Sequence, residues 1–130
     1  MAKRKNRSIQ SIVNREFISD LLSGALYDSP WFRCGTHEDT PTEVYQSAKD
    51  ANDCAEDIWA HVLTNGGAIL IEDVEDEKEY KIDYKKIVKG FKRFMIDDPR
   101  RYAEIMCEDG DFWAYDSLLQ TIVFGEVIYA

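Results

Sequence analysis

The sequence predicts an α+β domain in which a small antiparallel sheet packs against about four helices. Apolar residues recur every three or four positions in several segments, which is the pattern of helices that bury one face. Between two such segments, residues 64–83 contain two glycines, the apolar run AILIE, an acidic turn and the returning run EYKI. This order predicts a helix, a hairpin and a helix at the centre of the fold. Because two strands alone are marginally stable in water, the hairpin is expected to lie on the flanking helices and to recruit further strands.

Length and composition predict one folded unit. The chain has 130 residues, a common size for one domain. Hydrophobic residues make up 45% of it and charged residues 32%, which is typical of a globular protein and not of a disordered one. We therefore expect a flexible basic tail at residues 1–7 and a single α+β domain at residues 8–130.

One continuous helix is predicted over residues 9–25. Its apolar positions form one stripe: Ile9, Ile12, Val13, Phe17, Ile18, Leu21, Leu22 and Ala25. Ser8 or Ser11 is a suitable N-terminal cap, and Gly24 lies near the expected end.

The next segment combines a strand with an ambiguous stretch. Residues 31–35, WFRCG, follow a proline turn and predict a short strand. A capping signature at residues 40–43 would begin a long helix and make residues 43–46 helical. A second signature at residues 47–50 would begin the helix later and leave 43–46 as a strand that pairs with 31–34. The second interpretation is preferred.

Characteristic residues mark the ends of the following helix and hairpin. The helix is expected to bury Ala51, Ala55, Ile58, Trp59, Val62 and Leu63. Residues 65–67, NGG, can adopt the positive φ found at helix ends. In the strand that follows, Ile69 and Ile71 point to one face and Leu70 to the other, so at least part of both faces is expected to be covered. The turn at 74–79 carries five charges and is expected to be solvated.

A basic amphipathic helix should follow Asp83, a good N-terminal cap. Its apolar stripe comprises Tyr84, Ile87, Val88, Phe91, Phe94 and Met95, and its other faces carry Lys85, Lys86, Lys89, Lys92 and Arg93. Such lysines usually form a solvated face and only secondarily a site for an anionic partner. Gly90 costs the helix about 1 kcal/mol relative to alanine, which suggests close packing.

Two more helices and a strand complete the prediction. Asp98 and Pro99 begin a short helix that ends near Met106. A last helix follows Asp111 and ends before Gly125, and residues 126–129 are predicted to form a terminal strand.

No pattern in the sequence predicts an enzyme, a metal or a cofactor. Cys34 and His37 have a spacing that suits zinc, but Cys54 and His61 lie seven positions apart on a predicted helix, too far for one ion. The acidic residues 73–79 lack the alternating ligands and central glycine of a calcium loop. The glycines at 66–67 follow a helix, whereas a phosphate loop precedes one.

Cysteine usage and hydropathy suggest the cytoplasm. Three widely spaced cysteines do not form a disulfide framework. No secretory signal is recognisable, and no apolar run approaches the roughly 18 residues that span a bilayer. We expect a cytoplasmic protein without membrane association.

The net charge of −9 is unevenly distributed. Residues 1–15 carry +5, residues 16–79 carry −13, residues 80–101 carry +5 and residues 102–130 carry −6. The acidic body argues against general nucleic-acid binding, and only the basic N-terminal tail is a candidate for direct contact with nucleic acid.

Two segments resemble a loose group of small proteins carried by phages and integrative elements of bacteria. The first is GGAILI at 66–71 with its acidic turn and the helix YKKIVKG at 84–90, and the second is DSLLQTIVFGEVIY at 116–129. The resemblance implies a small acidic protein of the host cytoplasm that binds a host protein. Inhibitors of restriction or CRISPR nucleases are among such proteins, and they offer carboxylates to a nucleic-acid channel.

Two functional hypotheses follow. The first is a non-enzymatic inhibitor that binds a host nucleic-acid-binding protein or nuclease complex through an acidic face. The candidate residues are Asp50, Asp53, Glu56, Asp57, Glu72, Asp73, Glu75, Asp76, Glu77 and Glu79. In the second, the charge serves solubility and the protein assembles with itself, as a homodimer, through the edge at residues 126–129 or an aromatic patch that includes Trp31 and Trp113.

Overall fold

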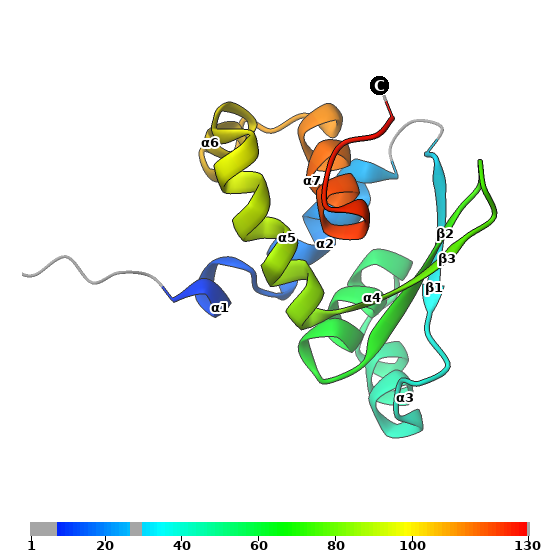
Figure 1. The fold of residues 1–130 in the computed structure, drawn as a ribbon. Coiled ribbons are helices and arrows are strands. Elements are labelled where there is room, and N and C mark those ends of the chain that lie inside the picture. Colours follow the sequence, from blue (N-terminus) through cyan, green and yellow to red (C-terminus); the bar gives the residue numbers. More distant parts are fainter. Residues whose placement is uncertain (1–7, 27–29, 130) are drawn as a thin grey trace, which may run out of the picture.

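The computed structural model describes residues 8–26 and 30–129. Within these ranges the chain forms seven helices and one three-stranded antiparallel sheet, which confirms the predicted α+β class (Figure 1). The elements in chain order are α1 (Ile9–Ile12), α2 (Arg15–Ala25), β1 (Phe32–Thr36), α3 (Thr42–Ala51), α4 (Ala55–Thr64), β2 (Ala68–Asp73), β3 (Glu79–Asp83), α5 (Tyr84–Asp97), α6 (Pro99–Met106) and α7 (Phe112–Phe124). The basic tail predicted at residues 1–7 lies outside the described residues.

The N-terminal helix is broken, which corrects the prediction of one helix over 9–25. Ser8 caps α1, as one of the two expected caps, but Val13 leaves the helical conformation. Asn14 then caps α2 by accepting a hydrogen bond from the backbone N–H of Phe17 (2.9 Å). The Tyr84 hydroxyl donates to the carbonyl of Val13 (2.7 Å), which satisfies a backbone acceptor at the break.

The prediction of a strand at residues 43–46 is wrong, because these residues belong to α3. β1 pairs with β2 instead. The hydroxyl of Thr40 is buried against the sheet, where it donates to the carbonyl of Ala68 (2.9 Å) and accepts from its N–H (3.0 Å). The chain is thereby anchored at Thr40, and α3 begins just beyond Pro41. A second break at residues 52–54 separates α3 from α4.

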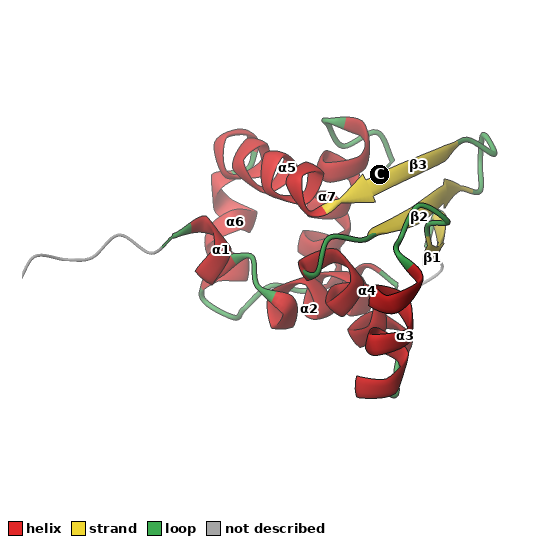
Figure 2. Cartoon of the chain, turned by 90° about the horizontal axis from the view of Figure 1, so that it is seen from below, coloured by secondary structure: helices red, strands yellow, loops and turns green. Residues whose placement is uncertain are grey.

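The sheet has the order β1-β2-β3, with the predicted hairpin as its second half. Ile69 and Ile71 point toward the helices and are fully buried, whereas Leu70, on the outer face, is half-buried. The helices lie to one side of the sheet in both views (Figures 1 and 2). The hairpin turn extends beyond them, and its residues 74–79 are exposed.

Helix α7 is the central helix, since it packs against α2, α5 and α6. Its residues from Ser117 to Val123 are all buried. Gly125, with a φ of 82°, ends the helix as expected. The terminal strand predicted at residues 126–129 is wrong: this segment is not in the sheet, and the side chain of Gln120 binds its backbone. None of the helices in the described ranges is long and apolar enough to cross a membrane.

Gly90 allows α5 and α7 to pack closely, as the sequence suggested. A Cβ atom at this position would lie 2.5 Å from the Cα of Ile122. Because backbone cannot move away as a flexible side chain can, the two helices would have to separate.

We predict that Gly90→Ala destabilises the protein by about 1–3 kcal/mol through this clash, although alanine is the better helix former. Gly35→Ala is the matched control, since a Cβ there would meet nothing within 4 Å. Urea denaturation of both variants tests the prediction. A Gly90→Ala protein as stable as the parent would contradict the close approach.

Candidate functional site

The ten acidic candidate residues form two separate groups in the structure. Asp50, Asp53, Glu56 and Asp57 lie around the junction of α3 and α4, and Glu72, Asp73, Glu75, Asp76, Glu77 and Glu79 lie on the β2-β3 hairpin. The hairpin group is the denser one and lies on the projecting turn.

We call Glu72, Glu75, Asp76, Glu77 and Glu79 the acidic tip. Glu75, Asp76, Glu77 and Glu79 are exposed, and Glu72 is half-buried. Glu72 and Glu79 lie directly opposite each other in the β2-β3 register. Within the described part of the chain, the only ion pair to these five carboxylates is Arg33 to Glu72, at 3.5 Å. The tip is therefore a concentrated and largely uncompensated negative surface.

Asp73 is not part of the exposed surface, which corrects its assignment to the acidic face. Its side chain is completely buried. One carboxylate oxygen accepts a hydrogen bond from the Tyr129 hydroxyl (2.6 Å), and the other accepts from the backbone N–H of Glu75 (2.9 Å). Asp73 anchors the tip from beneath and is unsuitable for contact with a partner.

The backbone of the turn is held by several hydrogen bonds. The N–H of Asp73 donates to the carbonyl of Lys78 (2.9 Å), and the N–H of Glu77 donates to the carbonyl of Asp73 (2.8 Å). The side chain of Asp76 accepts from the N–H of Lys78 (2.9 Å), and Glu77 takes a positive φ of 61°. The five carboxylates thus project from an ordered turn.

The α3-α4 group partly serves the fold. Asp57 accepts hydrogen bonds from the Ser19 hydroxyl (2.5 Å) and the Cys54 thiol (3.0 Å), and these bonds lower the pKa of its carboxyl group. Asp50 accepts from Gln46 (2.8 Å). Asp53 is exposed, while Glu56 and Asp57 are half-buried. This group offers less open negative charge than the acidic tip.

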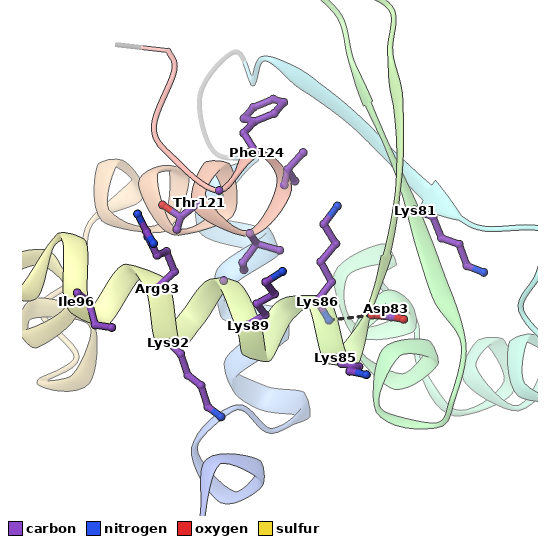
Figure 3. Close-up of a pocket in the computed structure, with 14 residues that line it drawn as sticks. Lys81, Asp83, Lys85, Lys86, Lys89, Lys92, Arg93, Ile96, Thr121 and Phe124 are labelled. Atoms are coloured by element: carbon purple, nitrogen blue, oxygen red, sulfur yellow. Dashed lines mark hydrogen bonds between the residues drawn. The ribbon is translucent and has the colours of Figure 1, made fainter.

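A second surface, which we call the basic groove, lies between β3, α5 and the C-terminal end of α7 (Figure 3). Its volume is about 830 Å³. The lining residues are Lys81, Asp83, Lys85, Lys86, Lys89, Gly90, Lys92, Arg93, Ile96, Thr121, Ile122, Val123, Phe124 and Gly125. In Figure 3, Lys86 and Arg93 extend from α5 toward the end of α7, and Lys92 extends to the other side.

The lysines of α5 leave positive charge available in this groove. Lys81 and Arg93 are neutralised by Asp39 and Asp97, each at 2.7 Å. By contrast, Lys85, Lys86, Lys89 and Lys92 form no ion pair with any residue in the described ranges. Burial, and then the charge of Lys89, lower the pKa of Lys86, while Asp83 opposes this shift.

The sequence pattern of α5 predicts a mainly solvated face for these lysines and gives no indication of a groove. The signal for the positive charge was the run of cations at residues 85–93. The apolar part comes from Ile96 in α5 and from the end of α7, which lies beyond α6 in the sequence. Nothing in the local pattern of α5 indicates which helix lies beside it.

The cysteines and histidines make separate contacts. Burial, together with the negative charge of Glu56, raises the pKa of the Cys34 thiol to about 12. His61 lies within 3.1 Å of Arg15 and 3.2 Å of Asn52. In the ranges that the structure describes, no three side chains of histidine, cysteine, aspartate or glutamate gather where they could hold a metal.

The prediction of an exposed aromatic patch that includes both Trp31 and Trp113 is also wrong, because only Trp113 is exposed. Trp31 is 8% exposed and packs on Phe32, Phe124 and Tyr129, and its indole N–H donates to Asp116 (2.7 Å). Trp113 alone of the two is exposed, at 52%. Trp31 belongs to the core.

No protein-family model matches the chain, and neither curated proteins nor solved structures show a significant match to it.

The contact between Tyr129 and Asp73 predicts a pH-dependent contribution to stability. The hydrogen bond to Asp73, followed by burial and the negative charges of the hairpin, raises the pKa of the Tyr129 phenol above its ordinary value of 10. A raised pKa means that folding favours the neutral phenol. Its contribution is complete below about pH 10 and is lost as the pH rises further.

We therefore expect Tyr129→Phe to lower the melting temperature at about pH 7, with the deficit narrowing above about pH 10, where the parent phenol also loses its advantage. Tyr45→Phe is the control, because Tyr45 is 37% exposed. Melting curves of the three proteins across this pH range provide the measurement. A deficit that stays constant up to about pH 11 would argue against the hydroxyl as its source.

Proposed function

We propose that this chain is a non-enzymatic binding protein whose acidic tip docks on a basic, nucleic-acid-binding surface of another protein. The observation that supports the proposal is the projecting hairpin with five carboxylates, of which Glu72 and Glu79 face each other directly. Docking there would exclude nucleic acid from the partner.

The opposed carboxylates favour a cationic partner. Asp73 and Lys78 are a hydrogen-bonded pair, and Glu72 and Glu79 are the next pair along the ladder. Because the two kinds of pair alternate in an antiparallel sheet, Glu72 and Glu79 form a non-hydrogen-bonded pair, in which side chains approach most closely. Like charges in this arrangement destabilise a sheet. A lysine or arginine of a partner would remove that repulsion, so the same residues that cost stability in the isolated protein would favour binding.

The preformed turn supports tight docking. Binding normally costs entropy when loops become ordered. Here Asp73, its bond to Tyr129 and the backbone bonds of the turn already fix the tip. Little further ordering is needed when the partner binds.

The proposed partner is a host defence complex such as a CRISPR effector or a restriction nuclease, in the host cytoplasm. Such enzymes line their channels with lysine and arginine to neutralise phosphates, and an acidic surface can compete for these residues. The resemblance to proteins of phages and integrative elements supports this class of partner. Binding of this kind weakens as salt rises.

The test is a charge reversal that spares the structure of the turn. Asp73 is buried and the side chain of Asp76 accepts a hydrogen bond from the backbone of the turn, so both are left unchanged. The variant is Glu75→Lys, Glu77→Lys and Glu79→Lys together. At position 77, which has a positive φ, one side chain unbranched at Cβ replaces another. We predict that it no longer captures the nucleic-acid-binding complex that the parent protein retains from bacterial lysate at low salt. It should also fail to inhibit nucleic-acid binding by that purified complex.

The matched control reverses the same number of charges near α3, with Glu43→Lys, Asp50→Lys and Asp53→Lys. All three residues are exposed. Because both variants change the net charge equally, a loss confined to the first one assigns binding to the acidic tip. Equal capture by both variants, or a captured complex that binds no nucleic acid, would refute the proposal.

Self-association remains a second candidate because β1 and β3 form the two edges of the described sheet. The contacts first expected for it change, because residues 126–129 form no strand and Trp31 is buried. Sedimentation over a range of protein concentrations tests this candidate directly, and a monomer throughout would remove it.

A further inference from the structure

The basic groove lies beside an unpaired strand edge. β3 is the edge strand, and Lys81 and Asp83 belong to both β3 and the groove lining. Asp73 pairs with Lys78 through a backbone hydrogen bond, and such pairs alternate along an antiparallel ladder. The backbone groups of Tyr80 and Ile82 therefore face β2, whereas those of Glu79 and Lys81 face outward.

The side chains of β3 show which face of the strand is solvated. Glu79, Lys81 and Asp83 are exposed, whereas Ile82 is buried. The outward N–H and C=O groups of Glu79 and Lys81 are the kind with which an added strand pairs. The edge thus supplies main-chain recognition on one wall of the groove.

The other wall supplies charge and apolar contact. Lys86 and Lys89 have no carboxylate partner in the described ranges, and they lie along α5 beside the groove (Figure 3). Ile96, which is 73% exposed, and the half-buried Phe124 add apolar surface. An occupant that matches both walls is extended, carries carboxylates and also has apolar side chains.

We propose that the basic groove binds an extended acidic segment of a partner protein, which adds to the sheet as a strand next to β3 and places carboxylates against Lys86 and Lys89. Strand addition gives affinity through the main chain, while alternate side chains give specificity. This surface shares only Glu79 with the acidic tip, and it uses the backbone of that residue and not its carboxylate. The proposal does not depend on the function of the tip.

Charge favours a peptide over the two other candidate occupants. A nucleic acid carries dense negative charge along its whole length and would be repelled by a chain of net charge −9. A second copy of the chain carries the same −9 and would be repelled as well. The net charge also opposes an acidic segment, but salt screens charges beyond roughly 10 Å, so a short segment in the groove responds mainly to the unpaired Lys86 and Lys89.

The test uses a synthetic peptide, acetyl-Glu-Val-Glu-Val-Glu-Val-Glu-amide, titrated into the full-length protein labelled with ¹⁵N. We expect amide shifts to concentrate at Glu79, Lys81 and the first half of α5. The double variant Lys86→Gln and Lys89→Gln should bind about tenfold more weakly, because two charge-assisted contacts are lost. Lys49→Gln with Lys78→Gln is the matched control, since both lysines are exposed and lie outside the groove.

A second peptide separates strand pairing from simple charge attraction. Methylation of the valine backbone nitrogens leaves its charge unchanged but blocks hydrogen bonding. This peptide should bind more weakly than the first; equal binding would overturn strand addition. If the double variant misfolds, the single variant Lys89→Gln replaces it in the titration, once a dispersed spectrum shows that it is folded.

Two other results would also overturn the proposal. One is tighter, lysine-dependent binding of a single-stranded oligothymidine of the same length. The other is a shift of the β3 amides with protein concentration in the absence of peptide, which would identify a second copy as the occupant.

Discussion

The buried amide of Gln120 determines the path of the chain after α7. Its side chain is completely buried, and all four of its hydrogen-bonding positions are used. The oxygen accepts from the N–H groups of Ile128 (2.9 Å) and Tyr129 (2.8 Å), and the nitrogen donates to Asp116 (2.7 Å) and to the carbonyl of Tyr129 (3.3 Å). Asp116 in turn accepts from Trp31. Since an unsatisfied buried polar group costs about 1–3 kcal/mol, a different course of this segment would be unfavourable.

The same network links the core to the surface. By fixing Tyr129, Gln120 brings the phenol to Asp73, which lies beneath the acidic tip. The negative tip is therefore supported by the last helix, although it belongs to the hairpin. The basic groove also uses that helix, because the end of α7 forms its apolar side. Two surfaces of opposite charge thus depend on one buried helix, which holds each of them in place.

Local patterns predicted the elements that local interactions determine. Asp83 and Asp98 cap their helices as the sequence indicated, and the hairpin forms where its apolar and acidic runs meet. The errors arose where a distant partner decides. Thr40 is hydrogen-bonded to Ala68 of β2, and α3 begins at Thr42 instead of at residues 47–50 as preferred from the sequence. Asp73 is buried by a tyrosine 56 residues away, so its charge was assigned to the surface. The sequence shows the lysines of α5, but it does not show that the end of α7 lies beside them and completes the groove.

In the hairpin turn, some residues hold the backbone in place, and others only contribute charge to the surface. Position 73 is constrained by burial, position 76 by its bond to the backbone of Lys78, and position 77 by its positive φ. Positions 75 and 79 are exposed, and their side chains carry none of these structural roles. Substitutions there would change the charge of the acidic tip while the fold is maintained. In the binding protein proposed above, these two positions would be free to change with the partner, while the residues beneath them would remain the same.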